Sequence, residues 1–129
     1  MNTTLILAYL GVVLMVGVAG IASAVGTAIC GQAAVGSMKK NNGAFGSYMI
    51  LSALPGSQGL YGFVCFFMVQ GLISAEMSML QAAAVFGAGL LVGIVNLAAA
   101  IYQAKVAATV KIAYNSGNAA KIRVLPITS

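Results

Sequence analysis

The chain has 129 residues, of which 61% are hydrophobic and only 5% are charged. Soluble domains carry charge on about a quarter of their residues, so this composition excludes an ordinary soluble domain and indicates a membrane protein. The net charge of +5 is therefore interpreted from the positions of the basic residues, as a sign of membrane topology. The basic residues form no tandem clusters with interleaved aromatic residues, so no nucleic-acid partner is expected.

Three long apolar stretches follow one another along the chain. Each is longer than the ~20 residues that a helix needs to cross the hydrocarbon core of a bilayer. The sequence therefore predicts an all-α membrane protein with three transmembrane helices and a single domain covering residues 1–129. The predicted helices span about Leu5–Gly36, Ala44–Ser74 and Met79–Tyr114, and residues 115–129 form a tail.

The basic residues predict the orientation of these helices. Lys39 and Lys40 lie in the first loop, and the other basic residues lie at or beyond the end of the third stretch: Lys105, Lys111, Lys121 and Arg123. With three spans both regions face the same side, and the positive-inside rule places the Lys39–Lys40 loop and the C-terminus in the cytoplasm. Glu76 then lies in the loop on the other side, where it is expected to help solvate or cap the start of the third helix.

An internal repeat relates the first stretch to the third. The segment Gly11–Gly17, "GVVLMVG", resembles Gly87–Gly93, "GAGLLVG", at an offset of 87 − 11 = 76 positions. A duplicated helical hairpin leaves such a repeat, so the three helices are interpreted as one hairpin plus the first helix of a second hairpin. By the same offset, the counterpart of Leu54 would follow Ser129, in a fourth helix.

Two ridges of small residues lie on different faces of the first predicted helix: Gly20, Ala24 and Ala28 on one, and Ala22, Gly26 and Cys30 on the other. Small residues let helices approach closely in lipid, where packing drives association. Two such faces favour a helix held between neighbours on both sides, as in the inner wall of a ring. A tight helix pair within one chain is the alternative. Gly20, Ala24, Gly26 and Ala28 are the predicted packing residues.

The second stretch is interrupted by the polar segment Leu54–Phe63, "LPGSQGLYGF". Its proline, Pro55, has no amide hydrogen and leaves a backbone carbonyl of the preceding turn without its usual donor. At 1.5 Å per residue, Gln58 and Gln103 lie at similar depths, about 21 and 17 Å from the predicted cytoplasmic ends of their helices. Carbonyl, hydroxyl and amide oxygens are ligands for hard cations. Interhelical hydrogen bonding around a kink is the alternative interpretation.

Three motifs together resemble a known family: "GIASAVG" at Gly20–Gly26, the segment Leu54–Phe63, and "AIYQAKVAA" at Ala100–Ala108. In this order, over nearly the whole chain, they resemble the proteolipid (the K or c subunit) of V/A-type rotary ATPases. The resemblance implies a rotor ring of identical chains in the V0 sector, which turns against a stator and is joined to a central stalk. Such a ring carries Na⁺ or H⁺ across a bacterial or archaeal plasma membrane. ATP is turned over elsewhere in the complex, so neither a catalytic site nor a cofactor is expected here.

The resemblance also implies an ion site. In sodium-type members the ligands match the backbone carbonyl of Leu54, the side chain of Ser57 (where threonine is more usual), and the amides of Gln58 and Gln103. The family's carboxylate lies on the fourth helix and has no counterpart among these residues. The alternative function is therefore a structural or assembly component of the ring that does not transport ions, in a chain truncated before that carboxylate.

Overall fold

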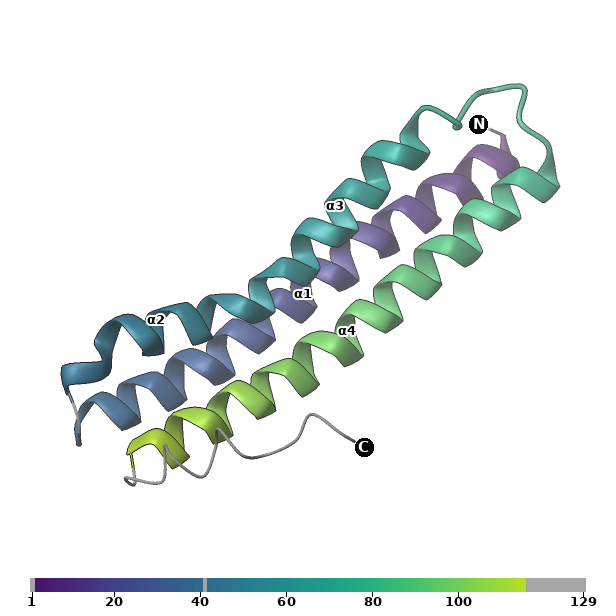
Figure 1. Ribbon diagram of the computed structural model, residues 1–129. Coiled ribbons are helices and arrows are strands. Elements are labelled where there is room, and N and C mark those ends of the chain that lie inside the picture. The colour runs from purple at the N-terminus through teal and green to yellow at the C-terminus, as the bar shows by residue number, and fades with distance from the viewer. Residues whose placement is uncertain (1, 41, 116–129) are drawn as a thin grey trace, which may run out of the picture.

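The computed structural model describes residues 2–40 and 42–115, which form three long helical rods, each antiparallel to the next along the chain (Figure 1). The rods comprise α1 (Thr3–Met38); then η1 (Asn42–Ala44), α2 (Phe45–Ala53), η2 (Leu54–Gly56) and α3 (Ser57–Gln70) in succession; and α4 (Met79–Asn115). Each rod is long and apolar enough to cross a membrane, with candidate spans of 36, 29 and 34 residues. The predicted all-α fold with three transmembrane helices is confirmed. Most of the predicted tail lies outside the described residues.

The two ends of the bundle differ in the segments that they contain. The N-terminus and the loop of residues 71–78 lie at one end, and the Lys39–Lys40 turn lies at the other, beside the end of α4 (Figure 1). The loop between α3 and α4 begins after Gln70, earlier than the sequence predicted. The antiparallel arrangement of rods that follow one another in the chain agrees with the short connections between them, whereas α1 and α4 run in the same direction (Figure 1).

Side chains close to α1 and α4 cap these two helices. The Asn2 side chain accepts a hydrogen bond from the amide of Thr4 (3.1 Å). Before α4, the Ser78 hydroxyl accepts from the Gln81 amide (3.2 Å), and the Gln81 side chain accepts from the Ser78 amide (3.0 Å). This reciprocal pair is a capping box. Glu76 is exposed in the preceding loop, so the cap expected from Glu76 is made by Ser78 and Gln81 instead.

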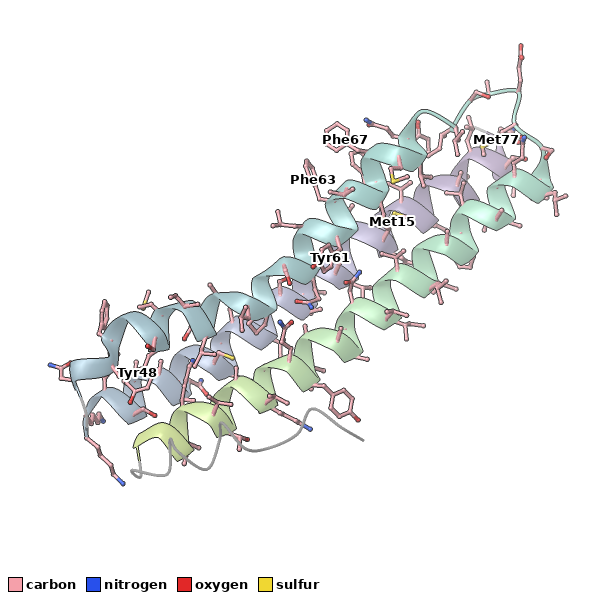
Figure 2. All side chains as sticks on the ribbon, viewed as in Figure 1. Met15, Tyr48, Tyr61, Phe63, Phe67 and Met77 are labelled. Carbon is pink, nitrogen blue, oxygen red and sulfur yellow. The ribbon has the colours of Figure 1, made fainter. Side chains whose placement is uncertain are left out.

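The interior is built mainly from small residues, which keep the rods close together. One buried cluster lies toward the 71–78 loop and consists of Ala8, Val12, Met77, Ala82 and Val85. Two others lie toward the opposite end and consist of Cys30, Ala104 and Ala107, and of Ala34, Ala44 and Tyr48. Large apolar side chains such as Phe63 and Phe67 project outward from α3 (Figure 2), as expected for a surface that faces lipid.

The two ridges of small residues on α1 have different surroundings. Gly26 is buried, and a Cβ atom added to it would lie 2.6 Å from Cβ of Pro55. Gly20, Ala24 and Ala28 are exposed, and a Cβ added to Gly20 would meet no atom within 4 Å. The Gly26 side therefore packs within the chain. A neighbour on the Gly20 side stays a prediction.

The second rod changes from α-helix to a 3₁₀ turn at Leu54–Gly56 and back to α-helix at Ser57. Pro55 cannot donate a backbone hydrogen bond, and the Ser57 amide instead donates to the carbonyl of Leu54, three residues earlier. Pro55 itself is buried against Gly26 of α1. The Leu54–Gly56 turn contacts both α1 and α4, and Gln58, which follows it, faces α4.

Candidate functional site

The structure brings together the four residues that the sequence singled out for ion binding. The Gln58 side-chain amide donates from Nε2 to Oε1 of Gln103, at 2.8 Å, which joins α3 to α4. The Ser57 hydroxyl lies 3.0 Å from the carbonyl oxygen of Leu54 and 3.2 Å from Oε1 of Gln58. Because a hydroxyl has one proton, Ser57 donates to one of these oxygens at a time. Residues 45 positions apart thus form one continuous polar cluster.

The oxygens of this cluster suit a hard cation. Its members are the Leu54 carbonyl, the Ser57 hydroxyl and the side-chain oxygens of Gln58 and Gln103, all uncharged. Oxygens of these types replace the water shell of cations in proteins. Gln58 is buried, Gln103 and Ser57 are partly exposed, and Leu54 is exposed.

The cluster is open on one side. A groove of about 320 Å³ lies between the second rod and α4, and both Leu54 and Gln103 line it. The other lining residues are Leu51, Tyr102, Val106, Ala107 and Val110. A shell formed by Leu54, Ser57, Gln58 and Gln103 would surround a cation on one side only, and the groove leaves room for a further ligand.

Charged ligands are not part of this cluster. The sequence has a single acidic residue, Glu76, which is exposed in the 71–78 loop at the end of the bundle near the N-terminus. Within residues 2–40 and 42–115, no group of three or more His, Cys, Asp or Glu side chains could hold a metal ion. The site thus supplies dipoles and no negative charge.

Sequence reasoning did not predict that two polar residues, Ser23 and Lys111, take part in contacts inside the bundle. Ser23 of α1 hydrogen-bonds to the backbone of the segment that carries Gln58. Lys111 of α4 is completely buried and bonds to α1 and α2. The available signal was the same in both cases, a polar residue within an apolar stretch. Its partners depend on the packing of three helices, which periodicity alone does not give. Tyr61, three residues after Gln58, is exposed on α3 (Figure 2).

Comparison with known proteins decides the family. Residues 10–69, which include the whole of Leu54–Phe63, match the family described as the C subunit of ATP synthase. The V-type sodium ATPase subunit K of Enterococcus hirae is 40% identical over 89 residues, which are 69% of this chain and 57% of that protein. The chain belongs to the V/A-type ATPase proteolipid family.

A second proteolipid relative supports the same assignment. The A-type ATP synthase subunit K of Methanocaldococcus jannaschii is 38% identical over 95 residues, 74% of this chain and 41% of that protein. The chain thus spans about half the length of these two relatives. The resemblance seen in the three sequence motifs is confirmed, and with three candidate spans the chain is an integral membrane proteolipid.

Proposed function

We propose that this proteolipid is a rotor-ring subunit of a V/A-type ATPase or ATP synthase and that Leu54, Ser57, Gln58 and Gln103 contribute to a Na⁺ site within the ring. Copies of the chain form the ring in the membrane. The ring turns against the stator, and the central stalk couples its rotation to ATP hydrolysis or synthesis in the soluble sector. The Lys39–Lys40 end of the bundle faces the cytoplasm.

The observation that carries the proposal is the hydrogen bond between Gln58 and Gln103 (2.8 Å). It fixes two amide side chains from different helices beside the Leu54 carbonyl and the Ser57 hydroxyl. Amide oxygens are good ligands for Na⁺, but they are too weakly basic to take up a proton. The cluster therefore favours Na⁺ over H⁺ as the carried ion. The name of the Enterococcus hirae relative, a sodium ATPase subunit, agrees with this choice.

Transport also requires a negative charge at the site. A net charge at the centre of the bilayer costs about 2.5–3.5 kcal/mol on insertion scales, and the neutral oxygens of this cluster leave the charge of Na⁺ uncompensated. Glu76 is exposed in the 71–78 loop and does not belong to the cluster. We therefore assign the compensating carboxylate to a helix outside these 129 residues, entering through the groove beside Leu54 and Gln103.

The uncharged cluster also favours a second candidate function. Without a carboxylate the chain is a structural or assembly component, which packs into the ring and carries no ion. In that case the bond between Gln58 and Gln103 only ties α3 to α4, as amide pairs do between membrane helices. The two functions differ in whether these side chains affect ion dependence.

The test uses the complete rotary complex containing this chain, reconstituted into lipid vesicles. ATP-driven uptake of ²²Na⁺ is measured against Na⁺ concentration for the wild type and for Gln58→Ala and Gln103→Ala. Each variant removes one oxygen ligand from a charged ion, so we expect the Na⁺ concentration for half-maximal uptake to rise by about tenfold or more.

Gln32→Ala is the matched control, because Gln32 is an exposed amide on α1. We expect wild-type Na⁺ dependence from it. Assembly of each variant is checked by the yield of intact complex. Assembled Gln58→Ala and Gln103→Ala complexes that keep wild-type uptake would support the structural function, and proton pumping independent of Na⁺ would exclude Na⁺ as the carried ion.

A further inference from the structure

The helix that carries Gln58 begins without a capping side chain of its own. The residue at the N-cap position of α3 is Gly56, which makes no side-chain cap bond. The first amides of a helix have no acceptor within that helix, and in α3 the Ser57 amide donates to the Leu54 carbonyl of the preceding 3₁₀ turn. A Ser, Thr, Asp or Asn residue at the N-cap usually supplies one, by accepting from the amide of the second or third residue of the helix. Gly56 has no side chain with which to do so.

Ser23 of α1 supplies this cap from the neighbouring helix. The Gly59 amide, which belongs to the third residue of α3, donates to the Ser23 hydroxyl oxygen at 2.6 Å. The same hydroxyl donates to the carbonyl oxygen of Gly56 at 3.1 Å. One side chain thus uses its acceptor and its donor on two backbone groups of the same turn.

Close packing between α1 and the second rod makes this arrangement specific. A Cβ atom added to Gly59 would lie 3.0 Å from the Ser23 hydroxyl oxygen, and one added to Gly62 would lie 2.7 Å from the carbonyl oxygen of Met15. On the other side of Ser23, a Cβ added to Gly26 would lie 2.6 Å from Cβ of Pro55. The glycines therefore let the Ser23 hydroxyl reach the backbone of α3.

Gln58 lies between the two groups that Ser23 holds. With the Gly56 carbonyl and the Gly59 amide both tied to α1, the backbone on each side of Gln58 is fixed. The direction of the Gln58 side chain toward Gln103 follows from that backbone. We infer that Ser23 is a positioning residue for the ion site, which acts through the backbone of residues 56–59 and does not contact the ion. This inference rests on the proposed function.

The test compares Ser23→Ala with the wild type in the reconstituted complex. Loss of a helix cap weakens the orientation of Gln58, so we expect the Na⁺ concentration for half-maximal uptake to rise roughly five- to tenfold. The maximal rate at saturating Na⁺ should stay unchanged, because the ring itself is intact. Solid-state NMR of the ¹⁵N-glycine-labelled chain in lipid should show a shifted Gly59 amide resonance in the variant.

Two further variants make the result decisive. Thr27→Val removes a hydroxyl one turn along α1 that bonds only within its own helix, to the carbonyls of Ser23 (2.8 Å) and Ala24 (3.1 Å), and we expect wild-type Na⁺ dependence from it. Ser23→Cys keeps the shape of the side chain with a somewhat larger atom at its end, but the thiol is a weak donor and acceptor. It should raise the half-maximal concentration even if Ser23→Ala complexes do not assemble.

The outcomes separate this inference from the proposed function. If Gln58→Ala impairs Na⁺ dependence while Ser23→Ala and Ser23→Cys leave it at the wild-type value, the positioning role is overturned and the ion site stands. A shifted Gly59 resonance with unchanged Na⁺ dependence also overturns it, since Ser23 is then structural only. If neither glutamine variant alters Na⁺ dependence, the proposed function fails and the role of Ser23 in ion binding fails with it.

Discussion

Lys111 shows how a basic residue is accommodated inside an apolar bundle. Its side chain is completely buried, and its amino group donates to the Cys30 carbonyl of α1 (2.7 Å) and to the Ser52 hydroxyl of α2 (2.6 Å). Ser52 in turn donates to the carbonyl of Tyr48 (2.8 Å). Burial of a polar group is costly unless it is hydrogen-bonded, and this chain of bonds offsets the cost. It also joins all three rods near the Leu54–Gly56 turn.

Replacement of Lys111 by methionine should therefore destabilise the bundle. The variant keeps the length of the side chain but removes two hydrogen bonds, so we expect a loss of about 1–3 kcal/mol in the free energy of unfolding. Urea titration of the helical circular dichroism signal in detergent micelles measures this loss. Lys105→Met is the matched control, because Lys105 is exposed with its amino group 5.5 Å from the centre of the Tyr102 ring. Equal stabilities of the two variants would contradict the prediction.

At the scale of the element, the closest packing occurs where the backbones of α1 and α4 meet. A Cβ atom added to Gly11 would lie 2.6 Å from Cα of Phe86, and one added to Gly89 would overlap the carbonyl of Gly11. The sequence repeat pairs Gly11 with Gly87, yet a Cβ added to Gly87 would meet no atom within 4 Å. A repeat identifies equivalent positions in two helices. Here the equivalent positions, Gly11 and Gly87, are not the ones that touch.

These glycines allow a paired test of the α1–α4 contact. In Gly89→Ala the new methyl group meets the Gly11 backbone, which cannot move aside as a side chain can, and we expect a loss of about 1–3 kcal/mol in stability. In Gly87→Ala the new methyl group meets open space, and the higher helix propensity of alanine should be neutral or stabilising by up to about 1 kcal/mol. The same urea titration compares both. A Gly89→Ala variant as stable as Gly87→Ala would show that the helices separate at little cost.

At the scale of the whole molecule, the spans and the meeting of Gln58 with Gln103 could be predicted from the sequence. Hydropathy fixes the number of spans, and equal depth in antiparallel neighbours brings the two amides to one level. The bonds of Ser23 and Lys111 could not be predicted in this way. They depend on how far each helix is rotated about its axis, and α1 has small residues on more than one face, so its sequence leaves that rotation undetermined.

The bundle is also longer than the bilayer core, which makes its orientation measurable. α1 has 36 residues and is about 54 Å long at 1.5 Å per residue, against a hydrocarbon core of about 30 Å. The ends of the rods should therefore reach the aqueous phase on both sides. Asn42 in η1 and Ala75 in the 71–78 loop are both exposed, at opposite ends of the molecule (Figure 1), and serve as reporter positions.

We expect Asn42 to face the cytoplasm and Ala75 to face the other side. A membrane-impermeant maleimide added to intact cells should then label Ala75→Cys and not Asn42→Cys, and inverted vesicles should give the reverse pattern. The unsubstituted chain is the control, because Cys30 is buried, Cys65 is only partly exposed, and both lie within candidate spans. Labelling of Asn42→Cys in intact cells would overturn the orientation. Lys39 and Lys40 would then lie outside the cytoplasm, contrary to the positive-inside rule.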